Sequence, residues 1–220
     1  MKLLLVAATE KEAETLEKKL WKENSHQVDF LITGVGMTAT TYALTKRLSK
    51  KKYDLVLNIG LAGTFREEIN IGEVVNVVTD CFADLGAEDG EKFLTISQLG
   101  LFDQDKFPFW NGKLKTDEAQ NYQSLSTLKN VKGITVNKVH GNVESIHRVI
   151  RKFHADIESM EGAAFLYVCL MEKVPCIQLR AISNRIEHRN RELWNIELAM
   201  SNLIEVLSQF IAGIEETKLS

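Results

Sequence analysis

Short apolar runs alternate with longer stretches of helical periodicity along most of this chain. Continuous apolar runs predict buried strands at residues 3–8, 30–33, 55–59, 74–78, 134–139 and 174–181. Apolar residues at helical spacing predict helices at residues 10–22, 38–49, 144–153, 161–171 and 193–214. This alternation predicts an α/β fold with three layers (α/β/α), in which helices cover both faces of a central twisted mixed sheet.

The pattern weakens between residues 80 and 128, where polar, aromatic and glycine residues are mixed. We expect extended loop and short elements there. No internal repeat, linker or low-complexity tail interrupts the chain, and 220 residues are enough for one well-buried core but few for two. The sequence therefore predicts a single domain over residues 1–220.

Charge and cysteine content exclude several classes of protein. With 27 basic and 30 acidic residues, the formal charge is -3, so no broad cationic face is available to bind nucleic acid. The three cysteines lack the spacing of a zinc site, and their odd number is typical of buried thiols in a reducing compartment. We expect a cytoplasmic protein with neither a disulfide nor structural zinc.

The apolar start of the chain raises the question of a signal peptide or membrane anchor. Three charged residues at 10–12 (EKE) end the apolar run well short of the length that secretion or membrane spanning requires. A buried first strand is the better interpretation, and we expect no membrane association.

Polar side chains and glycines gather where the predicted elements end. Glycine-bearing turns follow two predicted strands, at residues 34–36 (GVG) and 60–63 (GLAG), and glycine lets a backbone approach a ligand closely. Residues 159–164 (SMEGAA) place a carboxylate where a helix begins, and residues 180–185 (RAISNR) place an amide between cations where a strand ends. Ligands of α/β proteins bind at such element ends.

These motifs together resemble the purine nucleoside phosphorylase superfamily, in its nucleosidase branch, over nearly the whole chain. The resemblance is carried by residues 9–13 (TEKEA), 34–37 (GVGM), 58–63 (NIGLAG), 83–90 (ADLGAEDG), 107–109 (FPF), 159–164 and 180–185. It implies a nucleoside phosphorylase-like fold, a homodimer, and a site for a small-molecule purine nucleoside without cofactor or metal. The implied reaction is cleavage of the N-glycosidic bond by water, in menaquinone synthesis, on a nucleoside with an acidic aromatic 5′-group.

The resemblance also implies roles for two carboxylates. Glu12 matches the residue that activates the water, although an acidic residue in a first helical turn also stabilises the helix N-terminus. Glu161 matches the carboxylate that binds the ribose 2′- and 3′-hydroxyls, with Met160 packed on the sugar. The alternative for Glu161 is an exposed charge, but residues 162–164 (GAA) and the apolar run after them favour burial.

Asn184 departs from the nucleosidases that cleave adenine, which carry an aspartate here to pass a proton to purine N7. An amide cannot act as that acid. Its NH₂ can donate to N7 or a 6-oxo group and its carbonyl can accept from a ring N–H, which favours hypoxanthine over adenine. The alternative is that Asn184 caps a turn by binding its own backbone.

The remaining candidates are weaker. Arg185 and Arg189 could bind a carboxylate on the 5′-group, or belong to a solvated charged loop. Gly63 belongs to a glycine-bearing segment that lets backbone approach the ligand, and Phe82 could stack on the base or pack in the core. A lone histidine is more often structural, so His140 is given no catalytic role.

Three other functions remain open. A phosphorylase would bind phosphate as the nucleophile, but no arginine precedes Arg47 and Glu12 would repel phosphate. A dinucleotide-binding protein would need a third glycine where Ala39 stands and a later acidic partner. A nucleoside sensor would keep Glu161 and Asn184 without a water-activating base, and the presence of Glu12 argues against it.

Overall fold

The computed structural model describes residues 1–12, 27–188 and 190–216. Its main sheet contains β1 (Lys2–Ala7), β2 (Gln27–Ile32), β3 (Leu55–Thr64), β4 (Val74–Asp80), β7 (Leu114–Lys115), β8 (Lys129–Thr135), β9 (Ile157–Ser159) and β10 (Cys176–Arg185). The helices are α2 (Met37–Leu48), α3 (Val143–Phe153), α4 (Gly162–Met171) and α5 (Ile196–Glu216). The predicted α/β class is confirmed.

The sheet is mixed, as predicted, and part of it closes on itself. β10 pairs in parallel with β3 and antiparallel with β4, while β8 and β9 complete the path from β4 back to β3. β1 pairs with β3, and β2 pairs with β1, so these two strands extend the sheet beyond the closed part. Apolar residues of the closed part form a buried cluster: Ala62, Val75, Val77, Val131, Ile157 and Ile182, with Ile69 from the β3–β4 connection.

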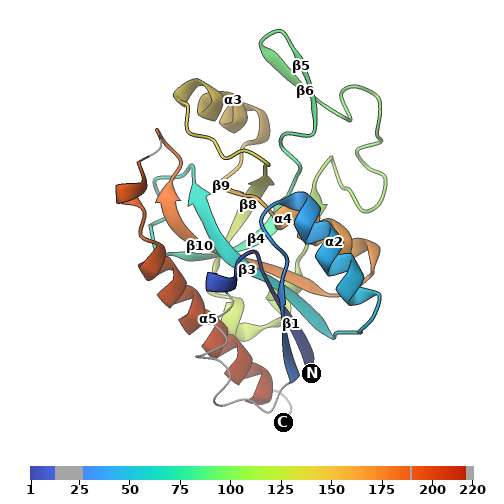
Figure 1. The fold of residues 1–220 in the computed structure, drawn as a ribbon, viewed down its shortest axis with the longest axis vertical. Coiled ribbons are helices and arrows are strands. Elements are labelled where there is room, and N and C mark those ends of the chain that lie inside the picture. The colour runs from blue at the N-terminus through green and yellow to red at the C-terminus, as the bar shows by residue number, and fades with distance from the viewer. Residues whose placement is uncertain (13–26, 189, 217–220) are drawn as a thin grey trace.

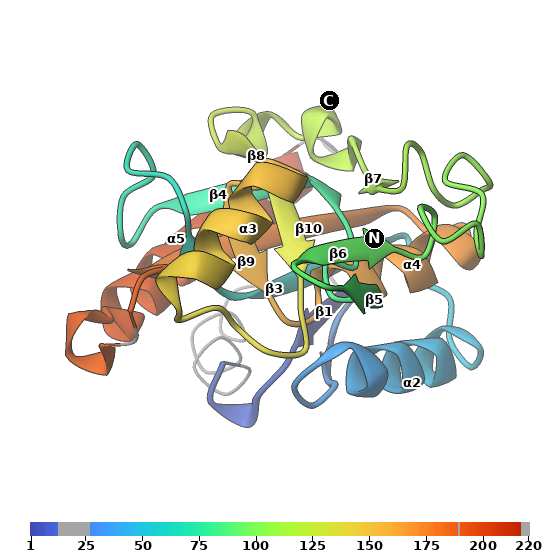
Figure 2. The ribbon, with the colours of Figure 1, turned by 90° about the horizontal axis from the view of Figure 1, so that it is seen from above.

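Helices cover both sides of the extended part of the sheet. The buried residues Leu3 and Leu5 belong to a cluster that includes α5, whereas Leu4 and Val6 belong to a cluster that includes α2 and α4. Successive strand residues point to opposite faces, so the unbroken apolar run of β1 serves two layers. Figures 1 and 2 show the strands between α5 and the α2–α4 pair.

The weakly patterned segment forms short elements, as expected. A hairpin of β5 (Gly86–Asp89) and β6 (Lys92–Thr95) projects from the top of the molecule in Figure 1. The short strand β7 and the 3₁₀ turns η1 (Glu118–Asn121) and η2 (Gln123–Leu125) follow it. Another 3₁₀ turn, η3 (Arg191–Leu193), precedes α5.

Several predicted boundaries are wrong. The strand predicted at residues 134–139 is β8, which begins at Lys129 and ends at Thr135. Its first half alternates between exposed polar residues and the buried Val131 and Gly133, so no apolar run reveals it. β3 and β10 continue to Thr64 and Arg185, through the glycine and amide motifs that were predicted to follow them as loops.

Two further differences concern the start and the middle of the chain. The helix predicted at residues 10–22 is helical over residues 10–12, and its remainder lies outside the described residues. The three-residue strand β9 was not predicted, because it is too short to show a period.

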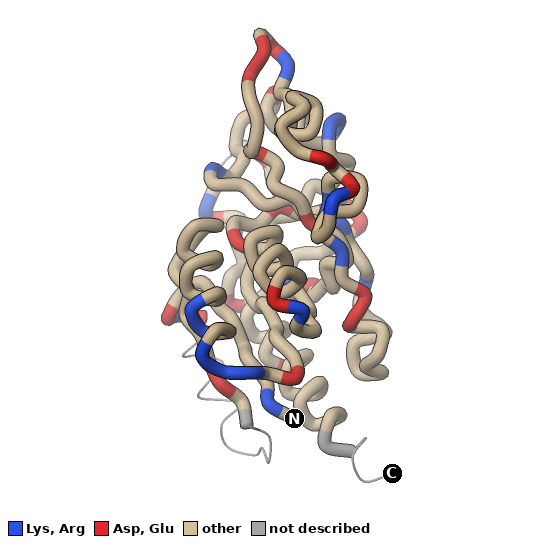
Figure 3. The backbone as a smooth tube through the Cα atoms, turned by 90° about the vertical axis from the view of Figure 1, so that its right-hand side faces the viewer, with Lys and Arg blue, Asp and Glu red and all other residues tan. Residues whose placement is uncertain are grey.

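Surface charge is mixed on the side shown in Figure 3, where Lys and Arg positions lie among Asp and Glu positions. Among the helices of the described residues, none is long and apolar enough to cross a bilayer.

Candidate functional site

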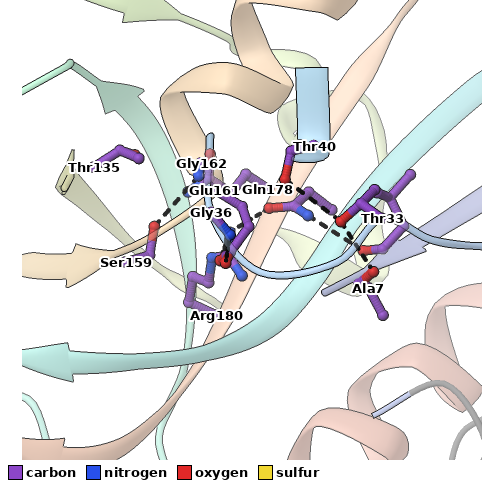
Figure 4. Close-up of polar contacts among 12 residues, drawn as sticks. Ala7, Thr33, Gly36, Thr40, Thr135, Ser159, Glu161, Gly162, Gln178 and Arg180 are labelled. Atoms are coloured by element: carbon purple, nitrogen blue, oxygen red, sulfur yellow. Dashed lines mark hydrogen bonds and ion pairs between the residues drawn. The ribbon is translucent and has the colours of Figure 1, made fainter. Parts of the chain in front are cut away.

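Glu161 is the N-cap residue of α4, two residues after β9 ends, and is 6% exposed. Its Oε1 accepts a hydrogen bond from the backbone N–H of Gly36 (3.0 Å). Gly36 has φ 92°, a conformation that a glycine adopts without strain, so the turn after β2 can present this N–H to the carboxylate. Figure 4 shows the Glu161 side chain beside Gly36 and Arg180. The predicted burial of Glu161 is confirmed.

Arg180, on β10, is the buried cation of this region and is 1% exposed. Its Nη2 lies 3.9 Å from Glu161 Oε2 and donates to Oδ1 of Asn58, while Asn58 Nδ2 donates to the carbonyl of Val6 (3.2 Å). In the sequence, Arg180 was recognised only as part of the motif at residues 180–185. The signal was a charged residue within a largely apolar strand, because a buried charge is costly unless it is paired.

Glu12 approaches the same guanidinium from another direction. A methyl group built on Gly60 would lie 2.6 Å from Arg180 Nη1 and 3.2 Å from Glu12 Oε1. Any side chain at position 60 would therefore displace one of the two groups. The structure thus brings Glu12 and Glu161 together around Arg180, from segments about 150 residues apart in the chain.

Glu12 also has the structural role that the alternative interpretation gave it. Its Oε2 accepts from the N–H and the hydroxyl of Thr9 (3.0 and 2.9 Å), and its own N–H donates to the Thr9 hydroxyl (3.3 Å). This reciprocal arrangement is a capping box. Oε1 has no hydrogen-bond partner within the described part of the chain and is the oxygen that lies over Gly60, so one carboxylate can serve both roles.

Beneath the start of α4 lies a second buried carboxylate, Asp80. Its Oδ1 accepts from the Thr135 hydroxyl (2.9 Å), which in turn accepts from the N–H of Ala163 (2.7 Å). Its Oδ2 accepts from Gln178 Nε2 (3.0 Å). A methyl group on Gly162 would lie 2.2 Å from Asp80 Oδ2, so this glycine permits the close approach of helix and carboxylate. This network fixes the helix start that carries Glu161.

Asp80 gives the protein a pH-dependent stability. Burial raises the pKa of Asp80 from 3.8 to about 6, although hydrogen bonds and the charge of Arg180 act in the opposite direction. Between these values the folded chain holds a proton that the unfolded chain has lost, so the free energy of unfolding falls as the pH rises from about 4 to about 6. The difference corresponds to about 3 kcal/mol.

We expect Asp80→Asn to abolish this fall, because an amide does not titrate. Gln178 can accommodate the new amide, because its Oε1 has no partner among the described residues. Rotation of the Gln178 side-chain amide lets this oxygen accept from the NH₂ group of the new asparagine. Urea unfolding of both proteins between pH 4 and pH 6.5 measures the effect. Parallel pH curves for the two proteins would contradict the assignment to Asp80.

Asn184 lies in a row of three residues on neighbouring strands. In the strand register it pairs with Gly63 of β3, and Gly63 pairs with Glu158 of β9. The Ser183 hydroxyl donates to Asn184 Oδ1 (2.8 Å), and Asn184 Nδ2 donates to the carbonyl of Arg185 (2.9 Å). The NH₂ group keeps one N–H for a ligand.

A pocket of about 100 Å³ opens at this row. Its lining includes Gly63, His140, Glu158, Asn184, Arg185 and Trp194. Glu12 and Glu161 do not line it. Glu12 lies near Gly60, and Glu161 lies near Arg180, which pairs with Gly60. Gly60 is three residues back along β3, which is about 10 Å of strand. The site therefore has two parts, a carboxylate pair around Arg180 and a pocket around Asn184.

The other predicted residues lie in different surroundings. Both terminal nitrogens of Arg185 donate to backbone carbonyls, of Arg66 (2.8 Å) and Glu67 (3.0 Å). Phe82 does not line the pocket; its ring centroid lies 6.4 Å from that of Tyr167 on α4, as in the core-packing alternative. Met160 is half-buried beside Glu161, and Arg189 lies outside the described residues.

Glu158 was not singled out from the sequence, and its partner His140 was given no catalytic role. The carboxylate of Glu158, 2% exposed, accepts from the backbone N–H of His140 (2.9 Å) and is hydrogen-bonded to its ring Nδ1. The signal in the sequence was weak, because Glu158 is a single acidic residue in a segment too short to be recognised as a strand. Among the described residues, no group of three or more metal-binding side chains is present.

Comparison with known proteins gives a consistent result. A family model described as the phosphorylase superfamily matches residues 6–212. Futalosine hydrolase of Thermus thermophilus is 31% identical over 83% of this chain and 80% of its own length. Futalosine hydrolase of Streptomyces coelicolor is 30% identical over 86% of this chain and 81% of its own length.

Solved structures show the same fold. The native futalosine hydrolase of Helicobacter pylori superposes with a TM-score of 0.79 at 15% identity, covering 96% of this chain and 97% of that one. The 5′-methylthioadenosine/S-adenosylhomocysteine nucleosidase of S. pneumoniae, bound to a transition-state inhibitor, gives 0.79 at 20% identity, covering 97% of this chain and 100% of that one.

Proposed function

This chain belongs to the phosphorylase superfamily, and from that premise we propose that it hydrolyses the N-glycosidic bond of a purine nucleoside. The observation that carries the proposal is the two-part site. Glu12 and Glu161 meet around Arg180, and the Asn184 pocket lies about 10 Å away along β3. A nucleoside can span that distance, with its sugar at the carboxylates and its base in the pocket.

The carboxylate pair suits the chemistry at the sugar. As the bond breaks, positive charge develops on the ribose and negative charge on the purine. Glu161, held by Gly36 and Arg180, accepts hydrogen bonds from the ribose hydroxyls, and Oε1 of Glu12 removes a proton from the attacking water.

The same pair favours hydrolysis over phosphorolysis. A phosphate nucleophile carries negative charge and needs cations that are free to bind it. Arg180 is buried at 1% exposure, is paired with Glu161 and donates to Asn58, and Glu12 stands on its other side. Water, which is neutral, meets no such repulsion.

Futalosine is the substrate that we propose, with hypoxanthine and dehypoxanthine futalosine as the products, in menaquinone biosynthesis. The relatives at 30 and 31% identity are named futalosine hydrolases. Asn184 supports a 6-oxopurine, since an amide can donate to a ring nitrogen or oxo group and accept from a ring N–H. Binding of a 5′-carboxylate by Arg185 or Arg189, the cytoplasmic location and the homodimer stay predictions.

One assay tests the proposal. The protein is incubated with futalosine, inosine and methylthioadenosine, with and without phosphate, and the free base is measured. We expect hypoxanthine from futalosine at a rate independent of phosphate. A requirement for phosphate would indicate a phosphorylase, a preference for methylthioadenosine would indicate the other nucleosidase type, and binding without cleavage would indicate a sensor.

Asn184→Asp should move the preference toward adenine nucleosides by about tenfold or more, because an acid replaces the amide that matches a 6-oxopurine. The ratio of kcat/KM for inosine and adenosine measures the shift. Asn190→Asp is the matched control, since Asn190 lines the same pocket but caps η3 through its Oδ1, which accepts from the N–H of Glu192 (3.1 Å). An unchanged ratio for Asn184→Asp would refute base recognition by Asn184.

A further inference from the structure

His140 is held in the wall of the Asn184 pocket by a buried carboxylate. Glu158 accepts from the His140 backbone N–H through Oε1 and is hydrogen-bonded to the ring Nδ1 through Oε2, so it holds both the backbone and the ring of His140. The side chains are 19% exposed for His140 and 2% for Glu158. The other ring nitrogen, Nε2, has no hydrogen-bond partner within the described ranges of the chain.

The strand register places this pair across the pocket from Asn184. Glu158 pairs with Gly63, and Gly63 pairs with Asn184, so Glu158 and Asn184 are separated by two strand spacings, about 10 Å. Gly63, between them, contributes no side chain. The side chain of Ile186 fills the space over Gly63, where a methyl group would lie 2.7 Å from its Cγ1. A planar purine that packs on Ile186 would meet Asn184 at one edge and the His140–Glu158 pair at the other.

The reaction needs a proton donor on the base side, because the departing purine takes the electron pair of the broken bond. Asn184 cannot supply a proton. The guanidinium of Arg185 is bound to the carbonyls of Arg66 and Glu67. The imidazole of His140 is hydrogen-bonded to Glu158 through Nδ1, so the N–H that it can donate to a ligand is the one on Nε2.

We propose that His140 donates the proton to the leaving purine and that Glu158 is its positioning residue. This inference rests on the proposed hydrolysis. The water oxygen bonds to C1′ as the C1′–N9 bond breaks, and the purine takes a proton from His140 Nε2 at a ring nitrogen of the edge that faces Glu158. The water proton passes to Glu12, and exchange with solvent then restores both side chains.

The pH profile of kcat/KM for a hypoxanthine nucleoside tests this role, below the pH at which the substrate itself ionises. A group that must be protonated produces a limb on which activity falls as the pH rises. His140→Asn should lower kcat by about 10²-fold or more and remove this limb. Besides Glu158, the charged or titratable groups lining the pocket are Arg185, Glu187 and His188.

Three further variants make the test specific. Glu158→Gln should keep the limb but lower kcat, because the imidazole loses the carboxylate that fixes its orientation. His147→Asn, an exposed histidine on α3 outside the pocket, should keep the wild-type profile. The double variant His140→Asn/Glu158→Gln leaves no unpaired buried carboxylate, so it replaces the single variant if that one unfolds, with the same loss expected.

The inference is overturned if the wild type shows no such limb, if the limb persists in the His140 variants, or if His188→Asn removes it instead. These outcomes differ from failure of the proposed function. If the proposed function is wrong, the wild type releases no base from any of the nucleosides.

Discussion

Glu12→Gln should lower kcat by about 10²–10⁴-fold and leave KM nearly unchanged, because the amide cannot take a proton from the attacking water. The fold should survive, since glutamine also completes a capping box with Thr9. The expected loss is therefore chemical. Steady-state kinetics with futalosine or inosine measures the loss of catalysis, and a thermal unfolding curve measures any loss of stability.

Glu10→Gln is the matched control for this variant. Glu10 lies in the same helical turn, is exposed, and carries the same charge. It should retain wild-type kcat within about twofold, as expected of a surface change. A fully active Glu12→Gln enzyme would show that another group activates the water, and Glu12 would then be left with its capping role alone.

Glu161→Gln should damage both kcat and KM, with a loss in kcat/KM of about 10²-fold or more. The ribose hydroxyls would lose charge-assisted hydrogen bonds worth about 1.5–3 kcal/mol each. Arg180 would also lose the carboxylate 3.9 Å from its Nη2, in a place where both side chains are buried. Steady-state kinetics measures the loss in kcat, and ligand-binding titrations measure the loss in nucleoside affinity.

The control for Glu161→Gln lies at the other end of the same helix. Glu172 is exposed and directly follows α4, so Glu172→Gln changes the same charge without touching the site. If Glu161→Gln changes kcat alone and leaves nucleoside affinity intact, Glu161 does not bind the sugar. A parallel unfolding curve in urea shows how much of the change comes from stability.

Much of the fold could be predicted because its elements have strong periods. β1 is an unbroken apolar run because both of its faces are buried, and α4 is apolar on nearly every turn. The burial of Glu161 could be predicted from the small and apolar residues that follow it. These are local properties of the chain, and a sequence displays them directly.

The remainder depends on pairing between distant segments. Gly60 serves to make room for Glu12 and Arg180, and nothing in the local sequence shows this. Glu158 becomes part of a pocket because β9 pairs with β3 in one particular register, and three residues are too few to predict that pairing. Arg180 could have been suspected from its charge, but not its partner Asn58.

The closed part of the sheet has a consequence for how the pocket comes into being. Gly63, Glu158 and Asn184 belong to strands that are far apart in the chain and meet only when β9, β3 and β10 are all paired. A segment of the chain that lacks one of these three strands cannot form the row. A purine that binds there therefore selects the native state and draws the whole folding equilibrium toward it.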